Sequence, residues 1–314
     1  MKKGKIVVII GPTAVGKTKY AIHVAQKLDG EILSADSMQV YRHMNIGSAK
    51  PTEEELAMVR HHLIGEVDPQ DEWTAAEYQK EAKRRIDQMF LRGKLPIICG
   101  GTGLYVNSLI YDMDFSTAKE DESLRNELQL LADSIGGQAL HERLKKVDPT
   151  AAERIHPNNI KKMIRAIEVA ETAGKGIPAF DGVFEKEGDY DCIMIGLNMN
   201  RQVLYNRIEQ RVDAMIEAGL VDEVRMLLGQ GLTEDDNSMK GIGYKELIGF
   251  LKSEYSLEEA VKRIKQNSRN YAKRQMTWFR RYKDIKWFDL TDVVNFEKSA
   301  EDITAYIREK LVES

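Results

Sequence analysis

Cysteine and long apolar runs are both scarce in this chain of 314 residues. The two cysteines, Cys99 and Cys192, lie far apart and each sits inside an apolar run, which argues against a disulfide framework and against a thiolate metal site. No run of eighteen apolar residues occurs, and the opening "MKKGK" passes directly into the short stretch "IVVII". A membrane-spanning helix and a signal peptide are therefore not expected, and we predict a cytoplasmic protein without a membrane partner.

Histidine gives no recognisable metal site. The six histidines are scattered along the chain, and the one adjacent pair is His61 and His62. On a helix these two side chains would point in different directions, whereas a metal-binding pair on a helix stands four residues apart. A histidine metal site is therefore not expected.

Positive charge is not in surplus, because the formal net charge is −4 at pH 7. A generally basic coat for nucleic acid is thereby excluded, but one segment departs from the average. Nine lysines and arginines, and no acidic residue, lie between Lys262 and Lys283. Such segregation of charge predicts a surface that is dedicated to an anionic partner.

Five apolar runs of strand length are continuous rather than alternating, which is typical of buried strands in a parallel sheet. They are "KIVVII" (5–10), "EILSA" (31–35), "LPIICG" (95–100), "CIMIGL" (192–197) and "IKWFDL" (285–290). Capping-box sequences at Thr52 and Thr74 mark the starts of two intervening helices, and Gly93 marks the end of the second. We therefore predict an α/β fold with a doubly wound parallel sheet.

The third and fourth runs are separated by roughly ninety residues, far more than an ordinary crossover needs. Helical patterning dominates this stretch, so we predict an inserted, mainly helical module at 113–190 that ends in "AGKGIPAFDGVFEKEGDYD". The two parts of the core would then be 1–112 and 191–314, with further helices at about 200–229 and 256–282.

A phosphate-binding motif follows the first strand and predicts a P-loop NTPase-like sheet. The stretch "GPTAVGKT" matches G-x-x-x-x-G-K-[ST] between a predicted strand and a predicted helix. Its backbone N–H groups and a lysine would bind phosphate oxygens, and its last hydroxyl is suited to ligate Mg²⁺ as the cofactor. The candidate diphosphate-binding residues are Gly11, Pro12, Thr13, Ala14, Val15, Gly16, Lys17 and Thr18, with Thr18 as the metal ligand.

We call residues 11–18 the cradle. The strands beside it lack the second acid with which motor and switch NTPases position magnesium and water. "LPIICGGTG" and "CIMIGLN" end without one, and only the second strand delivers an acid, Asp36 in "SADSMQVY". Asp36 and Thr102 in "GGTGLY" should face the cradle, because the ends of parallel strands meet at one edge, and the glycines at 100, 101 and 103 should let the backbone approach a ligand. This arrangement favours group transfer with Asp36 as the base. On the residues alone, an ordinary surface turn at Asp36 is the alternative.

Five segments together resemble the tRNA dimethylallyltransferases over essentially the whole chain. They are "GPTAVGKT", "SADSMQVYRHMNIGSAKP", "PIICGGTGLY", "GIGYKEL" and "YAKRQMTWFRR". The resemblance implies transfer of the dimethylallyl group from dimethylallyl diphosphate to the exocyclic amine of the adenosine beside the anticodon in tRNA, with release of pyrophosphate. No Cys/His zinc module of the kind carried by eukaryotic relatives is present, so we expect a bacterial-type enzyme, acting as a monomer.

The resemblance also implies catalytic roles for four residues. Asp36 would accept a hydrogen bond or a proton from the target amine, and Thr102 would lie beside it and contact the tRNA. Lys17 and Arg211, the latter in "IEQRVDAM", would neutralise the leaving diphosphate. On composition alone, Arg211 is better explained as a solvated charge on a helix.

Contact with tRNA is implied for several segments, including one inside the predicted insertion that would make the module a second jaw on the anticodon stem. The residues are Asp36, Ser37, Met38, Gln39, Thr102, Arg125, Lys161, Lys162, Met163, Ile164, Arg165, Lys240, Gly241, Ile242, Gly243, Tyr244, Lys245, Lys273, Arg274, Gln275, Met276, Thr277, Trp278, Phe279 and Arg280.

The basic segment itself suggests how an RNA backbone would be held. One helical stripe carries Lys262, Lys265, Arg269, Lys273 and Arg280, and a second carries Tyr271, Gln275, Trp278 and Tyr282. The cations have no acid nearby in sequence and would grip phosphates, whereas the aromatic rings are expected mainly to pack against the sheet or the next helix. The target adenosine would have to leave its stack to reach Asp36.

Three other functions remain open on the sequence. A P-loop small-molecule kinase would use ATP, with Asp36 as the base and Arg125 and Arg143 over the phosphates, but it leaves the basic segment without a purpose. An RNA-binding protein with a nucleotide switch lacks the water-positioning acid. An enzyme that prenylates free adenine nucleotides would keep its activity on AMP without residues 262–314.

Overall fold

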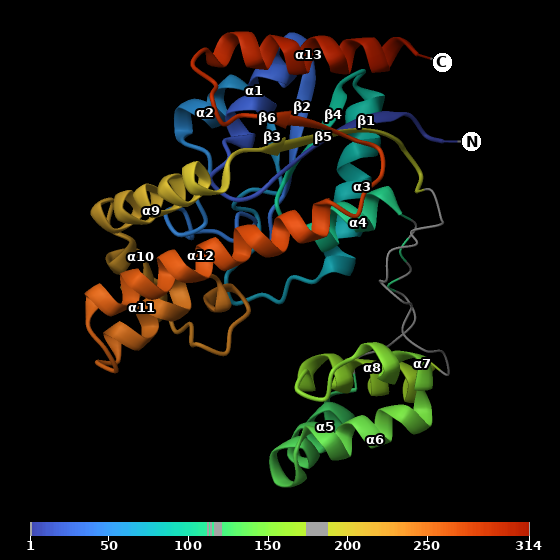
Figure 1. The fold of residues 1–314 in the computed structure, drawn as a ribbon, viewed down its shortest axis with the longest axis vertical. Helices are drawn as coiled ribbons and strands as arrows, with labels where there is room; N and C mark the ends of the chain where they lie inside the picture. Colours follow the sequence, from blue (N-terminus) through green and yellow to red (C-terminus); the bar gives the residue numbers. More distant parts are fainter. Residues whose placement is uncertain (1, 112, 114, 116–120, 174–187, 314) are drawn as a thin grey trace. The chain divides into compact units, whose positions relative to one another are not determined.

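Six parallel strands form one sheet in the computed structural model, which describes residues 2–111, 113, 115, 121–173 and 188–313 (Figure 1). The strands are β1 (Lys5–Ile10), β2 (Gly30–Ala35), β3 (His61–His62), β4 (Leu95–Gly100), β5 (Asp191–Asn198) and β6 (Ile285–Asp289). Their order across the sheet is β3-β2-β4-β1-β5-β6, and every neighbouring pair is parallel. The predicted α/β fold and all five predicted strands are therefore confirmed.

His61 and His62 form the short strand β3, so the helical geometry considered for this pair does not apply. Backbone pairing with Ile32 and Leu33 extends the sheet at the β2 edge, and this tertiary pairing outweighs the local pattern. The pairing buries His62, whose Nε2 lies 2.6 Å from Oε2 of Glu31. The pair is therefore part of the sheet's structure.

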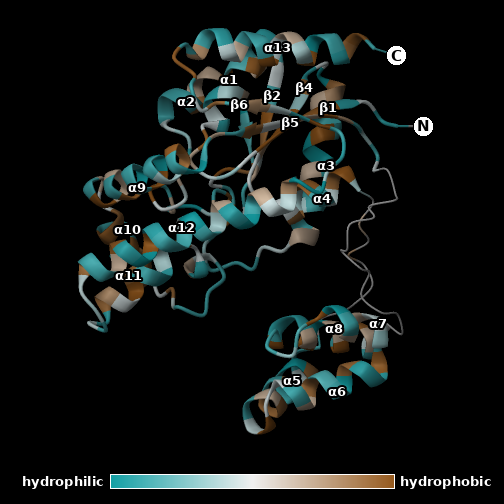
Figure 2. Ribbon diagram, in the orientation of Figure 1, coloured by the Kyte–Doolittle hydropathy of each residue, from teal (hydrophilic) through white to brown (hydrophobic). Residues whose placement is uncertain are grey.

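Helices cover both faces of the sheet. On one face, α1 (Lys17–Lys27) and α13 (Phe296–Val312) pack against the strands, and on the other face α3 (Ala75–Leu91) and α4 (Gly103–Ile110) do so (Figure 1). Hydrophobic residues gather in the strands and on α4, while α12 (Leu257–Phe279) carries mostly hydrophilic residues (Figure 2). Continuous apolar strands are required because both faces are covered.

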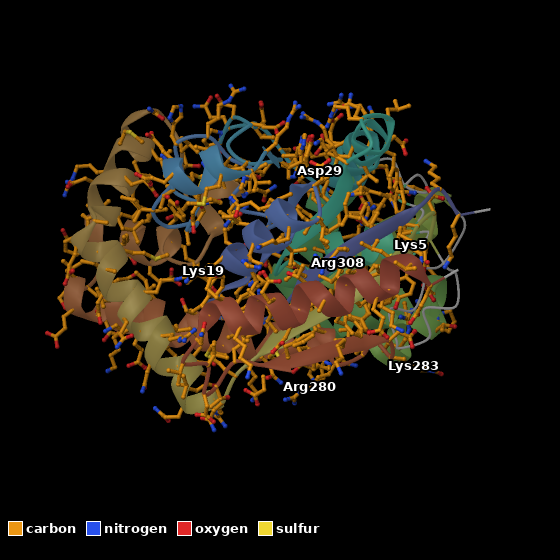
Figure 3. The ribbon with its side chains drawn as sticks, turned by 90° about the horizontal axis from the view of Figure 1, so that it is seen from above. Lys5, Lys19, Asp29, Arg280, Lys283 and Arg308 are labelled. Atoms are coloured by element: carbon orange, nitrogen blue, oxygen red, sulfur yellow. The ribbon has the colours of Figure 1, made fainter. Side chains whose placement is uncertain are left out.

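The predicted helix starts are confirmed. Thr52 caps α2 (Glu53–Met58) and Thr74 caps α3, each with the reciprocal bonds of a capping box, and α3 ends just before Gly93, whose φ is +69°. The last turn of α13 lies beside Lys5, the first residue of β1 (Figure 3). Nζ of Lys5 donates a hydrogen bond to the carbonyl oxygen of Lys310 at 2.9 Å. That bond satisfies one of the carbonyl groups which a helix end leaves open.

The segment predicted as one helix at 200–229 is two helices, α9 (Arg201–Glu217) and α10 (Leu220–Gly229). Gly219 separates them with a left-handed φ of +95°, a conformation that glycine adopts without steric cost. The turn η1 (Ser238–Lys240), α11 (Tyr244–Leu251) and α12 complete a second hydrophobic cluster with α10. Along α12, Ile264 belongs to this cluster and Phe279 to the core under the sheet, so α12 joins the two.

Residues Met113–Glu185 form a compact unit separate from Met1–Asp112 with Lys186–Ser314, and we call these the small and the large unit. The described helices of the small unit are α5 (Glu122–Ile135), α6 (Gly137–Val147), α7 (Pro149–Arg154) and α8 (Ile160–Ala173), around a hydrophobic core of their own. The insertion was expected to end at 190, but Tyr190 is buried in the large unit. The expected final stretch of the insertion falls largely on 174–187, outside the described residues.

No helix in the described ranges has both the length and the apolar character that crossing a bilayer requires.

Candidate active site

The carboxyl ends of β1, β2 and β4 lie side by side in the large unit. Gly100 at the end of β4 pairs with Ile10 on one side and with Ala35 on the other. The cradle that follows β1 and the Asp36 that follows β2 therefore begin at the same level of the sheet, as the sequence predicted.

A cavity of about 680 Å³ opens at this edge, and every residue of its wall belongs to the large unit. The predicted site residues in its wall are Thr13, Ala14, Gly16, Lys17, Thr18, Asp36, Ser37, Met38, Gln39, Arg211, Lys240, Gly241, Ile242, Gly243, Lys245, Arg274 and Gln275. The wall contains seven lysines and arginines but two carboxylates, those of Asp36 and Glu55. This surplus of positive charge is suited to an anionic ligand.

The lysine of the cradle binds the backbone of the cradle itself. Nζ of Lys17 donates hydrogen bonds to the carbonyl oxygens of Gly11 at 3.0 Å and Pro12 at 2.9 Å. Burial lowers the pKa of Lys17 to about 8, although the negative charge of Asp36 acts in the opposite direction. The amine therefore titrates close to neutral pH, and a phosphate in the cradle would favour its charged form.

Arg211 supplies a second cation to the cavity from α9. Partial desolvation by the cavity walls lowers the pKa of Arg211, and the carboxylates of Asp36 and Glu55 counteract this shift. The residue remains open to solvent, and an arginine keeps its charge at any physiological pH. Two cations, Lys17 and Arg211, are thus available to one ligand.

Asp36 is held by the turn that it begins. Its Oδ1 accepts hydrogen bonds from the backbone N–H groups of Met38 at 2.9 Å and Gln39 at 3.4 Å, which is the geometry of an Asx-turn. Within the described residues, Oδ2 has no hydrogen-bond partner and remains available to a ligand. Asp36 is therefore both the surface-turn residue that the alternative interpretation expected and a cavity carboxylate.

Thr102 does not form part of the cavity wall. Its hydroxyl accepts a hydrogen bond from the backbone N–H of Ser37 at 3.0 Å and lies 3.3 Å from the Ser37 hydroxyl. Thr102 thus holds the loop after β2 against the end of β4, and this structure gives it a positioning role beside Asp36.

The glycines after β4 have a packing role that the sequence did not show. A Cβ atom on Gly100 would lie 2.2 Å from the carbonyl oxygen of Ala35, and one on Gly101 would lie 2.1 Å from Nε2 of Gln275. A Cβ on Gly103 would lie 2.4 Å from the ring of Trp278. The glycines therefore make room for β2 and α12, and Gly100 also lines the cavity.

Lys50 and Tyr271 are two of the cavity residues that were not predicted as site residues. Lys50 lines the cavity and donates a hydrogen bond from Nζ to Oδ1 of Asn45 at 2.9 Å, and burial lowers its pKa to about 8. Tyr271 was expected to pack, yet it also lines the cavity, and burial raises its pKa to about 12, so its phenol stays protonated. Lys50 lies in "SADSMQVYRHMNIGSAKP", one of the segments that carried the resemblance. Its place in that segment could have identified it as a site residue.

One strand end was overlooked. β6 also ends in an acid, Asp289, whose Oδ1 accepts a hydrogen bond from the backbone N–H of Thr291 at 2.9 Å. Asp289 lies on an edge strand and is absent from the cavity wall, so it does not replace the missing magnesium acid.

The basic stripe on α12 is only partly available to a ligand. Lys265 pairs with Asp213 at 2.6 Å and Arg269 with Glu209, both on α9, so these two cations are not free for phosphates as expected. The acids are distant in sequence and reach α12 through helix packing. Exposed cations follow toward the carboxyl end of α12, and Figure 3 places Arg280 at the periphery of the molecule.

The aromatic stripe mainly packs, as expected for it. Tyr282 is buried, and Trp278 packs against the core under the sheet. The indole N–H of Trp278 donates to Oδ1 of Asn107 at 3.3 Å.

Several residues predicted to contact tRNA are buried, which corrects that assignment. Phe279 and Tyr244 are fully buried in the large unit, and Met163 and Ile164 belong to the core of the small unit. A side chain enclosed by its own fold has no surface to offer an RNA, so these four residues stabilise the elements that carry their exposed neighbours.

In the small unit, two predicted tRNA contacts bind one buried carboxylate. Arg125 lies 2.8 Å and Arg165 2.6 Å from Glu168, which has no exposed surface. Burial raises the pKa of Glu168, but the hydrogen bonds from Arg165, the backbone of Asp121 and Arg125 outweigh it and lower the pKa below its ordinary value. Lys161 and Lys162 on the same helix are exposed.

Comparison with known proteins places the chain in a family. Residues 39–282 match the IPP transferase family. The tRNA dimethylallyltransferase of Alkaliphilus oremlandii is 51% identical over 303 residues, or 96% of each chain, and that of Bacillus pumilus is 48% identical over 313 residues, or 99% of this chain and 98% of its own.

Solved structures agree with the sequence comparison. The tRNA isopentenylpyrophosphate transferase of Bacillus halodurans superimposes with a TM-score of 0.75 at 46% identity, over 98% of this chain and 96% of its own. A eukaryotic dimethylallyltransferase acting on tRNA gives a TM-score of 0.84 at 28% identity, over 99% of this chain and 80% of its own. By sequence and by structure, this chain belongs to the IPP transferase family.

Proposed function

We propose that this protein transfers the dimethylallyl group of dimethylallyl diphosphate to the exocyclic amine of the adenosine adjacent to the anticodon in tRNA, and releases pyrophosphate. The observation that carries the proposal is the meeting, in one cavity, of a phosphate cradle and a single anchored carboxylate, Asp36. The similarity of nearly the full chain to tRNA dimethylallyltransferases supports the same conclusion.

The leaving group is the first task of the site. When the allylic carbon–oxygen bond breaks, its electron pair departs with pyrophosphate, and the carbon shares its positive charge over three atoms. Lys17, the N–H groups of the cradle and Arg211 stand where they would neutralise that departing charge. Fixed cations and dipoles are effective here because they need no reorganisation as the charge develops.

The nucleophile is the second task. The lone pair of an adenine amine is delocalised into the ring, so the amine attacks weakly unless a base accepts its proton. Oδ2 of Asp36 would take that proton as the new nitrogen–carbon bond forms, while Oδ1 stays bound to the turn. Holding the amine in line with the breaking bond would add the advantage of proximity.

Magnesium fits the oxygen donors of the cradle. Mg²⁺ commonly uses one or two protein oxygens and takes its other ligands from water and phosphate. The described residues contain no cluster of three or more His, Cys, Asp or Glu that could hold a metal by itself, but the Thr18 hydroxyl lines the cavity at the start of α1. Thr18 would hold the ion, which when bound would neutralise diphosphate charge.

Surfaces on both units would hold the tRNA. On the large unit these are the cavity rim at Lys240 to Lys245 and the exposed end of α12, where Lys273 and Arg280 offer charge to phosphates. On the small unit, Lys161 and Lys162 offer the same, and we propose that this unit contacts the anticodon stem. Such contacts would position the RNA while the target base is extruded into the cavity.

The setting of the reaction follows from its substrate. Since tRNA works in the cytoplasm, we place the protein there. We also propose that the protein acts as a monomer.

The deciding experiment is incubation with unmodified tRNA and labelled dimethylallyl diphosphate, first with Mg²⁺ and then with the ion removed, followed by nucleoside analysis. We expect label on the adenosine beside the anticodon, and its loss without Mg²⁺. Release of ADP from ATP without prenyl transfer would overturn the proposal in favour of a kinase. Transfer to free AMP but not to tRNA would overturn the choice of acceptor.

A further inference from the structure

Gln275 lies within the basic segment of α12, yet its side chain does not face solvent. Only 5% of the residue is exposed. Its Oε1 accepts a hydrogen bond from the backbone N–H of Thr13 at 2.8 Å, and its Nε2 donates one to the carbonyl oxygen of Gly101 at 2.9 Å. Thr13 offers a donor and Gly101 an acceptor, so the two partners fix the orientation of the amide.

These two bonds join three segments that are distant in sequence. Thr13 belongs to the phosphate cradle after β1, Gly101 to the turn after β4, and Gln275 to the helix whose exposed end we assign to tRNA. The turn after β4 also carries Thr102, which holds the loop of Asp36. A single amide group thus connects the cradle to the turn that positions the carboxylate.

The glycine at 101 is matched to this amide. A Cβ atom at that position would lie 2.1 Å from Nε2 of Gln275 and 3.7 Å from Nζ of Lys17. Any other residue at 101 would therefore displace the amide from both of its bonds. The absence of a side chain at 101 is a condition for the Gln275 bridge.

We propose that Gln275 is a positioning residue that fixes the phosphate cradle against α12 and the end of β4, and that it contributes to diphosphate binding and turnover rather than to tRNA affinity. This replaces the direct tRNA contact that family resemblance implies for it. The turnover part rests on the proposed function, whereas the binding part does not. Both polar groups of this buried amide already bind backbone partners of the cradle and of the turn after β4, which favours a positioning role over a direct contact with the RNA.

The test replaces Gln275 by methionine, which has a similar length and no hydrogen-bonding amide. Gln266→Met on the same helix is the matched control, because Gln266 is exposed and bonds only within α12, to Asn270 and Arg269. Three quantities are measured in each full-length variant: the Kd for inorganic pyrophosphate, the Kd for unmodified tRNA, and the kcat and KM for dimethylallyl diphosphate.

For Gln275→Met we expect the pyrophosphate Kd and the KM for dimethylallyl diphosphate to rise about tenfold, the loss expected when buried donor and acceptor groups are left unpaired. We expect kcat to fall as well, because the cradle is less fixed relative to Asp36. The tRNA Kd should stay within about twofold of the parent, as should all values for Gln266→Met. If Gln275→Met weakens tRNA binding and leaves pyrophosphate binding intact, or changes neither, the proposal is wrong.

Gly101→Ala provides an independent approach that leaves Gln275 in place. It should raise the pyrophosphate Kd to a similar extent by pushing the amide away, and the double variant should be no worse than either single one. Additive losses would overturn the proposal even if Gln275→Met folds poorly. If the parent protein binds pyrophosphate but transfers no prenyl group, the proposed function fails while the binding comparison still decides the role of Gln275.

Discussion

The hydroxyl of Thr102 accepts a hydrogen bond from the backbone N–H of Ser37 at 3.0 Å and thereby ties the end of β4 to the turn that carries Asp36. We predict that Thr102→Val lowers kcat about tenfold, because the isosteric side chain removes the acceptor and loosens the turn. Thr102→Ser should keep most of the activity. Both are measured by single-turnover prenyl transfer with saturating tRNA. A variant that keeps kcat but binds tRNA less tightly would instead indicate direct RNA contact.

Replacement of Asp36 by Asn tests the roles of its two oxygens separately. Asp36→Asn retains an acceptor for the N–H of Met38 but cannot take a proton, so we expect kcat to fall on the order of a hundredfold or more with an unchanged melting temperature. Asp68→Asn is the control, since Asp68 accepts the same kind of turn bond, from the N–H of Gln70 at 3.0 Å, on the surface. Asp36→Asn with near-normal turnover would rule out the base.

Diphosphate affinity should depend on pH through Lys17. Burial lowers the pKa of this amine to about 8, so it is charged below that pH and neutral above it. Because the charged form binds phosphate, the Kd for pyrophosphate should rise as pH increases through about 8 and level off below it. Calorimetric titration across this range measures the effect. Lys17→Met should bind weakly at every pH with a flatter profile, and an unaltered pH response in that variant would assign the titration to another group, with Lys50 the first to examine.

The effect of replacing a cation of α12 should depend on whether that cation is exposed or paired with an acid of α9. Lys273→Gln and Arg280→Gln remove exposed charges, so each should weaken tRNA binding and reduce the salt dependence of log Kd by about one unit. Lys265→Gln and Arg269→Gln break pairs with α9 and should instead cost about 0.2 to 1 kcal/mol of unfolding free energy each, with smaller effects on tRNA. Filter binding over a salt series and denaturant titration measure the two quantities. Equal salt slopes for both pairs would contradict this division.

Within the segment "KKMIR" of the small unit, substitutions at neighbouring residues should affect different properties, either stability or tRNA binding. Met163→Ala opens a cavity in the core of that unit and should destabilise it by about 2 to 5 kcal/mol. Lys162→Ala removes an exposed charge, so it should leave stability unchanged and weaken tRNA binding. Hydrogen exchange over residues 121–173 reports the stability of the small unit by itself. Normal exchange in Met163→Ala would show that the core tolerates the loss.

Local signals in the sequence predicted the elements that local physics controls. Apolar runs gave the five long strands, capping boxes gave the starts of α2 and α3, and the glycine-rich motif gave the cradle, because each depends on residues adjacent along the chain. β3 was not predicted, because two residues contain no periodicity and their conformation depends on the edge of β2.

Side-chain roles were less predictable because they depend on what packs opposite. The sequence shows a stripe of cations on α12, but Asp213 and Glu209 on α9 decide which of them are paired. It shows glycines after β4, but the neighbouring α12 decides that two of them make room for Gln275 and Trp278.

The sequence by itself determined the parallel sheet, the phosphate cradle at its edge and the acid at the end of the second strand, since strand ends and motifs are set by short-range order. Only the tertiary structure decided which residues share the cavity, which cations remain exposed and which side chain joins the cradle to α12. Those outcomes depend on contacts between segments far apart in the chain, and Gln275 meets Thr13 only when the whole sheet has formed.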